Sequence, residues 1–295
     1  MCRAVKTRSA ALKLLRPHQW VKNTFVFVGL LFGHAWGDAA LLTASVCAFA
    51  AFCALSSAVY VVNDWIDREQ DRAHPVKCRR PLASGQVGGL AAAFLAVGCL
   101  ALGLGLAAYV GTPLVLIALA YLALNLVYNL GAKHVVLLDV FIIAAGFMLR
   151  ILAGTLGVGL SPSHWLLLCG FSLTLFLGFA KRRAELTALR GRDAASHRRV
   201  LSHYSPAMLD KMIAVVISAV VVTYSLYTVS PETIALHGTH NLIYTVPFVL
   251  YGLFRYVFLL HRREGGGDPA VELLRDRHLQ MAVLGWLAVT VVMLS

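Results

Sequence analysis

The segment NDWIDREQDRAHPVKCRRPLASG, from Asn63 to Gly85, holds the densest group of residues that could do chemistry. Asp64, Asp67 and Asp71 follow one another at i, i+3 and i+7. A helix that continued to Pro75 would place the three carboxylates on one face. Neighbouring carboxylates repel one another unless a cation lies between them, and Mg²⁺ combines one or two carboxylates with substrate phosphates. The spacing therefore predicts a site for hard divalent cations.

Cationic side chains follow this acidic spacing at once. Lys77, Arg79 and Arg80 supply counter-charge for phosphate oxygens. Together with the carboxylates they indicate a metal-bound phosphate substrate. The competing interpretation is a solvated helix end with internal ion pairs, such as Asp64 with Arg68.

Transmembrane helices are the elements that must position these residues. The 295 residues are 59% apolar and only 14% charged, with a mean hydropathy of +0.74, which is too apolar for an ordinary soluble domain. The uncharged runs are long enough to cross a bilayer core of roughly 30 Å at about 1.5 Å per residue. The sequence predicts an all-α polytopic membrane protein with nine transmembrane helices. These are expected at Val21–Trp36, Ala39–Val62, Leu90–Tyr109, Pro113–Tyr128, Val135–Val158, His164–Ala180, Ala207–Val229, Leu242–Leu260 and Leu279–Ser295.

The positive charge lies on one side of this topology. The formal net charge is +12, and all but two of the 26 Lys and Arg fall in the N-terminal segment and in alternate loops. The four loops on the other side contain none, so the charged side is expected to face the cytoplasm. We predict a single domain over residues 1–295, in a cell (inner or plasma) membrane, with residues 1–20 as a basic cytoplasmic tail. Basic residues split among loops and mixed with acids argue against nucleic-acid binding.

The two exceptions are Arg150 and Arg255, which fall within predicted helices. An arginine at membrane depth is costly unless it faces a polar cavity. Arg255 is close enough to the charged side for its guanidinium to reach the surface. Arg150 lies roughly 16 Å beyond Asp139 along the same helix. It is expected either to line an anionic pocket or to form an internal structural pair.

The motifs of the chain resemble a known family. The pattern N-D-x-x-D-x-x-x-D, followed by H-P and R-P-x-A-S-G, resembles the first signature of the UbiA superfamily of intramembrane prenyltransferases. Four further stretches are similar to the decaprenyl-phosphate phosphoribosyltransferase branch, so that the resemblance spans nearly the whole chain. The family implies an all-α bundle with a cytoplasm-facing active-site cleft. The four stretches are Leu15–Asn23, Tyr128–Val140, Gly146–Gly154 and Phe179–Leu186.

This resemblance implies a Mg²⁺-dependent transfer of 5-phosphoribose from phosphoribosyl pyrophosphate to a polyprenyl phosphate, with release of pyrophosphate. Asn63, Asp64, Asp67 and Asp71 would hold the metal ion, while Lys77 and Arg80 would steady the pyrophosphate oxygens. The acceptor phosphate is already anionic, so no strong general base is required. Membrane lipids and a second copy of the chain are the further partners expected.

Other polar residues are candidates for the same site. Where aromatic prenyltransferases of the superfamily carry a second D-x-x-x-D pair, this chain has the single Asp139, which cannot duplicate the first site. Asp139 is expected to bind sugar hydroxyls or a metal ion. An interfacial tyrosine, a snorkelling lysine and an ion pair remain the alternatives for the residues near Asp139. Anionic-lipid contact is the alternative for the basic sixth loop. The substrate-binding candidates besides Asn63 and Arg80 are Lys22, Tyr128, Lys133, Arg150, Lys181, Arg182 and Arg183.

Two other functions remain open at this point. The first is a prenyltransferase that moves an isoprenyl group from a diphosphate to an aromatic acceptor, which could use the same metal site. The missing second aspartate pair and the extra basic residues argue against it. The second is a lipid-phosphate transporter, although transporters place ionisable groups near the membrane midplane and this chain places nearly all charge on one side.

Overall fold

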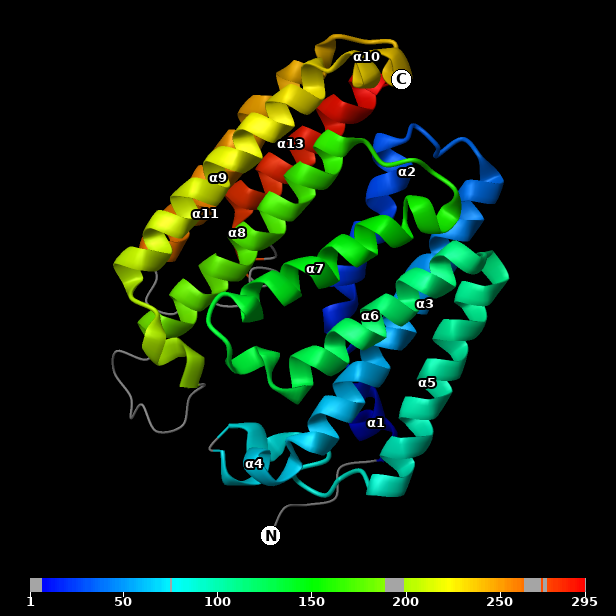
Figure 1. Ribbon diagram of the computed structural model, residues 1–295, viewed down its shortest axis with the longest axis vertical. Helices are drawn as coiled ribbons and strands as arrows, with labels where there is room; N and C mark the ends of the chain where they lie inside the picture. The colour runs from blue at the N-terminus through cyan, green and yellow to red at the C-terminus, as the bar shows by residue number, and fades with distance from the viewer. Residues whose placement is uncertain (1–6, 75, 189–198, 263–271, 273–274, 295) are drawn as a thin grey trace. The chain divides into compact units, whose positions relative to one another are not determined.

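The structure is a computed structural model that describes residues 7–74, 76–188, 199–262, 272 and 275–294 (Figure 1). These residues form helices joined by turns, and none of them lies in a β-strand. Helices suit a bilayer because each one satisfies its own backbone N–H and C=O groups. The all-α class predicted from the sequence is confirmed.

Eight helical segments of the described chain are long and apolar enough to cross a membrane. Their ends lie within a few residues of eight predicted spans, except that the second and sixth helices extend further into the charged loops. The spans are α3 (Ala39–Ile66), α5 (Gly89–Val110), α6 (Thr112–Leu130), α7 (Leu138–Ala153) with η4 (Leu156–Val158), α8 (His164–Ala188), α9 (Pro206–Val229), η7 (Asn241–Thr245) with α11 (Val246–Arg262), and α13 (Arg277–Leu294). The shorter elements are α1 (Thr7–Leu15), η1 (Pro17–Phe27), α2 (Val28–Phe32), α4 (Arg68–Ala73), η2 (Lys77–Arg79), η3 (Ala132–His134), η6 (Arg199–His203) and α10 (Pro231–His237).

The first predicted span, Val21–Trp36, has a different structure. Its place is taken by the 3₁₀ helix η1 and the short α2, so nine α-helical spans are not confirmed within the described residues. A 3₁₀ helix repeats every three residues, which aligns Trp20 and Asn23 toward α3. Trp20 donates to Ser57 Oγ at 3.0 Å and Asn23 donates to Ser56 Oγ at 3.3 Å. A 3₁₀ helix rises about 2.0 Å per residue, so η1 and α2 still extend over roughly 30 Å.

Packing divides the chain into two compact units. The first comprises Met1–Leu130 and Leu149–Leu160, and the second comprises Gly131–Met148 and Ser161–Ser295. The helix α7 therefore begins in the second unit and ends in the first. A single domain over the whole chain stays a prediction.

In the first unit α3 is the central helix, and it packs along α5, as Figure 1 shows, and against η1. The approach to α5 is close because Gly103 has no side chain: a Cβ there would lie 2.6 Å from Leu55 Cγ. The helix α1 also packs into this unit, with Ala10 and Leu14 fully buried. Residues 7–15 therefore form a helix docked in this unit, while the cytoplasmic location of residues 1–20 stays a prediction; residues 1–6 lie outside the described chain.

In the second unit α8 packs along α9, and α11 packs along α13. Phe176 and Tyr256 meet edge to face in its core at 5.3 Å between ring centroids. Asp276 precedes α13 and accepts hydrogen bonds from Leu279 N at 3.0 Å and from Arg255 Nη2 at 2.8 Å. Arg255 therefore ties α11 to the start of α13, and its reach to the membrane surface stays a prediction.

Candidate active site

The acidic residues lie where α3 leaves the apolar region. The helix ends at Ile66, and Asp67 separates it from α4, so the single helix expected to continue to Pro75 is interrupted. The break still leaves Asp64 and Asp71 buried, each with 3% of its surface exposed. Asp67 itself is partly exposed. The three carboxylates therefore do not share one continuous helical face.

Arginine side chains bridge the two buried carboxylates. Arg80 Nη1 lies 2.6 Å from Asp71 Oδ2 and 3.0 Å from Asp64 Oδ1. Arg16, at the end of α1, places Nη2 2.6 Å from the same oxygen of Asp64. We call Arg16, Asp64, Asp71 and Arg80 the acidic cluster. It replaces the internal pair of Asp64 with Arg68 that was the alternative reading of the sequence.

Arg16 was not among the residues predicted for the site. Its backbone has a φ of 52°, in the left-handed region, and Pro17 follows it. A proline disfavours the α conformation of the residue before it, so α1 ends here and the chain turns. The Arg-Pro pair was the one sequence signal for this turn, but it does not say that the side chain reaches residue 64.

The donor set of the acidic cluster fits a hard divalent cation. Among the described residues, no three His, Cys, Asp or Glu side chains gather closely enough to hold a metal ion together, so the predicted four-ligand set is not preassembled. Two buried carboxylates nevertheless share one cationic nitrogen. Mg²⁺ needs only one or two protein carboxylates when phosphates supply the other oxygens. Asn63 lies beside this site, and its Oδ1 accepts a hydrogen bond from Asn129 Nδ2 at 2.5 Å.

Several predicted substrate ligands lie on partly or fully exposed surface. Lys77 is exposed in η2, and Lys22 is partly exposed in η1. Tyr128 lies near the end of α6 and is also partly exposed. In the second unit Lys133 in η3 and Lys181 in α8 are partly exposed. These side chains remain candidates for contact with substrate.

Asp139 has a different environment from the one expected. It is fully buried, and its Oδ2 accepts a hydrogen bond from Arg182 Nε at 2.7 Å. The guanidinium of Arg182 is 1% exposed and also pairs with Glu185. Tyr204 donates its hydroxyl hydrogen to Asp139 Oδ1 at 3.1 Å. Both oxygens of Asp139 are therefore engaged inside the second unit. The roles of Asp139 at a sugar or metal and of Arg182 in substrate binding stay predictions, and both would require these contacts to open.

Tyr204 connects this buried pair to the backbone. Its hydroxyl oxygen accepts a hydrogen bond from Leu137 N at 2.7 Å. Leu137 has a φ of 67°, a left-handed conformation that is strained for a residue with a side chain. Burial raises the pKa of Tyr204 to about 12, so the hydroxyl keeps its proton and continues to donate to Asp139. Tyr204 was not among the residues predicted for the site.

Arg183 is the more accessible neighbour of Arg182. Its Nε lies 3.0 Å from Asp210 Oδ1, and its side chain is 14% exposed. It also donates a hydrogen bond to Thr187 on the same helix. Arg183 pairs α8 with α9, so a role as a substrate ligand would require this ion pair to open.

Arg150 lies in a polar and aromatic cluster of the first unit. Its Nε donates to Asn23 Oδ1 at 2.7 Å and its Nη2 donates to Tyr121 at 3.1 Å. The guanidinium also lies over the rings of Tyr121 and Phe52, at 4.8 and 5.9 Å from their centroids. These contacts hold η1 against α6 and the end of α7. They therefore favour a structural role for Arg150 over the lining of an anionic pocket.

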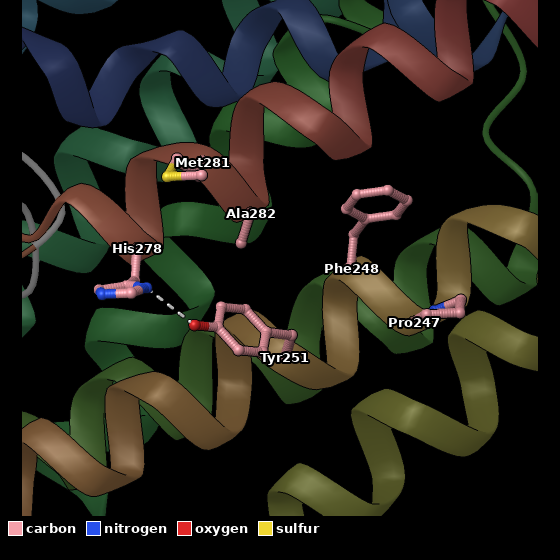
Figure 2. A pocket seen from close by; sticks show the side chains of 6 residues that line it. All are labelled: Pro247, Phe248, Tyr251, His278, Met281 and Ala282. Atoms are coloured by element: carbon pink, nitrogen blue, oxygen red, sulfur yellow. Dashed lines mark hydrogen bonds between the residues drawn. The ribbon is translucent and has the colours of Figure 1, made fainter.

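An apolar groove of about 360 Å³ lies between α11 and α13 (Figure 2). One polar contact crosses it, between Tyr251 Oη and His278 Nδ1 at 3.0 Å. It contains none of the predicted site residues. The groove is lined by Pro247, Phe248, Tyr251, His278, Met281 and Ala282.

The membrane helices and the acidic cluster define an integral membrane protein with a charged site beside the end of a membrane span. The model of the UbiA prenyltransferase family matches residues 23–274 of the chain. The chain belongs to this family of membrane enzymes.

Individual relatives extend the comparison over nearly the whole chain. The chain is 35% identical to decaprenyl-phosphate phosphoribosyltransferase of Corynebacterium glutamicum, over 93% of this chain and 83% of that protein. It is 34% identical to the protein of the same name from Mycolicibacterium smegmatis, over 95% of this chain and 90% of that protein. Among solved structures, a UbiA homologue from Archaeoglobus fulgidus bound to GPP and Mg²⁺ has a TM-score of 0.72, with 18% identity over 97% of this chain and 99% of that one. At this identity the likeness shows the fold alone.

Proposed function

We propose that the protein transfers 5-phosphoribose from phosphoribosyl pyrophosphate to a polyprenyl phosphate. A phosphate oxygen of the lipid would form a bond to the anomeric carbon of the ribose. The bond from that carbon to the pyrophosphate oxygen breaks, and pyrophosphate leaves with the electron pair. The attacking phosphate is already ionised, so the step balances without a general base.

The observation that carries this proposal is the acidic cluster. Asp64 and Asp71 are buried and close enough to share one cationic nitrogen, which supports the binding of a metal–diphosphate complex by the same two carboxylates. A bound Mg²⁺ would neutralise charge on the departing pyrophosphate. The residues of this chain would hold the donor: Asp64 and Asp71 through the metal, with Asn63 and Asp67 beside them, and Lys77 through the phosphate oxygens. Catalysis would then rest on positioning and electrostatics.

The environment of Asp139 favours ribosyl transfer over aromatic prenylation. Aromatic prenyltransferases of the superfamily generally carry a second aspartate pair, whereas Asp139 is a single acid already neutralised by Arg182. One acidic site then remains in the described chain at the end of α3. This suits a donor with one diphosphate, and it agrees with the names of the two relatives described above.

A direct test offers purified protein two donors. Label from radioactive phosphoribosyl pyrophosphate should enter a lipid fraction only when polyprenyl phosphate and Mg²⁺ are both present. Transfer from an isoprenyl diphosphate to an aromatic acid, with none from the ribosyl donor, would establish the prenyltransferase alternative instead. Movement of polyprenyl phosphate across proteoliposomes without any product would indicate a transporter.

Two acids on α4 provide a matched pair of variants for the site. Asp71→Asn should lose most of the transfer activity, because it removes a carboxylate of the acidic cluster. Glu69→Gln should retain it, because Glu69 is exposed and pairs only along its own helix with Arg72 in the contacts described. If Asp71→Asn retained as much transfer activity as Glu69→Gln, Asp71 would not be a residue of the active site.

We also propose that the acidic cluster faces the cytoplasm, in accordance with the distribution of Lys and Arg. In a variant without its native cysteines, Ser84→Cys should be protected from a membrane-impermeant thiol reagent in intact cells. Thr112→Cys, at the start of α6 and just beyond the opposite end of α5, should react. The reverse labelling pattern would invert the topology and deny the site access to cytoplasmic phosphoribosyl pyrophosphate.

A further inference from the structure

We infer that Arg80 is an exchangeable counter-cation, which neutralises the acidic cluster in the absence of substrate and gives up that place when a divalent cation binds. The inference rests on the metal site of the proposed function. It concerns how the chain keeps that site stable before the metal arrives, and what Arg80 does afterwards.

The geometry gives Arg80 the position of a bridging cation. One nitrogen of its guanidinium contacts an oxygen from each buried carboxylate, at 2.6 and 3.0 Å. A divalent cation bound through the same two oxygens would compete with this nitrogen for them. On this proposal the guanidinium and the metal ion exchange for these two oxygens of Asp64 and Asp71.

Charge gives the same result. Two carboxylates and two guanidinium groups make the acidic cluster formally neutral, so it holds little net attraction for a further dication. Removal of Arg80 from the carboxylates restores a negative site, with Arg16 still paired to Asp64 at 2.6 Å. Metal binding must therefore overcome the ion pairs of Arg80 or be accompanied by its departure.

Exposure shows which partner is able to move. The side chain of Arg80 is 29% exposed, whereas those of Asp64 and Asp71 are 3% and 4% exposed. Arg80 follows the short η2 in extended backbone geometry, with φ of −63° and ψ of 144°. The arginine can rotate toward solvent while the carboxylates stay in place. After leaving them, its guanidinium would be beside the metal and available to the diphosphate oxygens.

The test measures metal affinity without substrate. Mn²⁺ binding to the purified protein in detergent, followed by electron paramagnetic resonance or calorimetry, should be about tenfold tighter in Arg80→Gln than in the wild type. This is the factor expected if Arg80 occupies the site in about nine tenths of the molecules. Arg79→Gln removes an exposed neighbouring charge and should leave the affinity unchanged. Asp71→Asn should weaken it.

Stability provides a second readout in case Arg80→Gln folds poorly. Mn²⁺ should raise the thermal stability of Arg80→Gln more than that of the wild type, because the metal replaces the missing guanidinium. Equal or weaker Mn²⁺ binding in Arg80→Gln, with no added stabilisation, would overturn the exchange while leaving the metal site intact. If Mn²⁺ binds neither protein, the metal site of the proposed function is wrong and the inference falls with it.

Discussion

Arg182 and Arg183 are adjacent in α8, but the ion pair of Arg182 is buried and that of Arg183 is partly exposed. Their contributions to stability can therefore be compared directly. Arg182 pairs with Asp139 at 2.7 Å, with both side chains at most 1% exposed. Arg183 pairs with Asp210 at 3.0 Å, and these side chains are 14% and 35% exposed. Removal of one partner from a buried pair leaves an uncompensated charge and costs about 3–5 kcal/mol. A solvent-screened pair contributes about 1 kcal/mol or less.

We therefore expect Arg182→Ala to lower the free energy of unfolding by about 3 kcal/mol or more, and Arg183→Ala by about 1 kcal/mol or less. Equilibrium unfolding in mixed micelles measures both values. The double variant Asp139→Asn with Arg182→Met should recover part of the loss, since it removes the buried charges together.

Kinetics distinguish this structural role from direct contact with substrate. If Arg182 bound phosphoribosyl pyrophosphate, Arg182→Ala would raise the KM for the donor while its stability stayed near that of the wild type. That result, or equal destabilisation by the two arginine variants, would refute the reasoning from burial.

Three further outcomes follow from the contacts described above. Tyr204→Phe should lower the free energy of unfolding by about 1–3 kcal/mol, because Leu137 N and Asp139 each lose a hydrogen-bond partner. The pKa of Tyr204 is raised to about 12, so its ionisation should destabilise the wild type only as the pH rises from about 10 through 12. Thermal unfolding scans at different pH values would show this loss. The pKa of Asp276 is lowered to about 2, chiefly by its hydrogen bond with Arg255. Its contribution to the free energy of unfolding should therefore be present above about pH 4 and lost as the pH falls through about 2. Acid unfolding of Asp276→Asn should not show this loss of stability. Gly154→Ala should prevent folding, as judged by size-exclusion chromatography in detergent, because its Cβ would lie 1.6 Å from Val26 O; Gly105→Ala, where the Cβ would meet nothing within 4 Å, should fold normally.

The long uncharged runs of the sequence were sufficient to predict the eight spans among the described residues. An apolar helix exposes apolar side chains to the lipid and pairs its own backbone N–H and C=O groups. The predicted run Ala39–Val62 became α3 with its start at the same residue, where Asp38 accepts hydrogen bonds from the first backbone N–H groups. The first span could not be assigned from hydropathy alone. Its buried positions Asn23, Val26 and Gly29 recur every three residues, which indicates a 3₁₀ rather than an α-helical face.

The candidate site was predicted in part. Local spacing predicted a divalent-cation site on Asp64, Asp67 and Asp71, because helical residues three and seven apart lie on one face. In the structure Asp64 and Asp71 share Arg80, and the metal site stays a prediction. It did not identify Arg16 as a partner of Asp64, since the two residues are 48 positions apart. Asp139 was predicted as the single acid in the stretch where aromatic prenyltransferases carry a second aspartate pair, and Arg182 because it lies at a helix exit on the same side as the acidic motif. Their separation of 43 residues concealed the pairing that buries both of them.

The contact between η1 and the end of α7 also constrains the order in which the protein can be completed. Arg150 and Asn23 are 127 residues apart, and Gly154 admits the backbone of Val26 at the same junction. During synthesis the N-terminal segment emerges long before either partner exists. Its contacts with Arg150 and Gly154 cannot form until the four longer spans up to the end of α7 have been synthesised. A nascent chain truncated before residue 150 should therefore leave this segment sensitive to protease. A chain extended beyond residue 160 contains the whole first unit, and its N-terminal segment should then become protected.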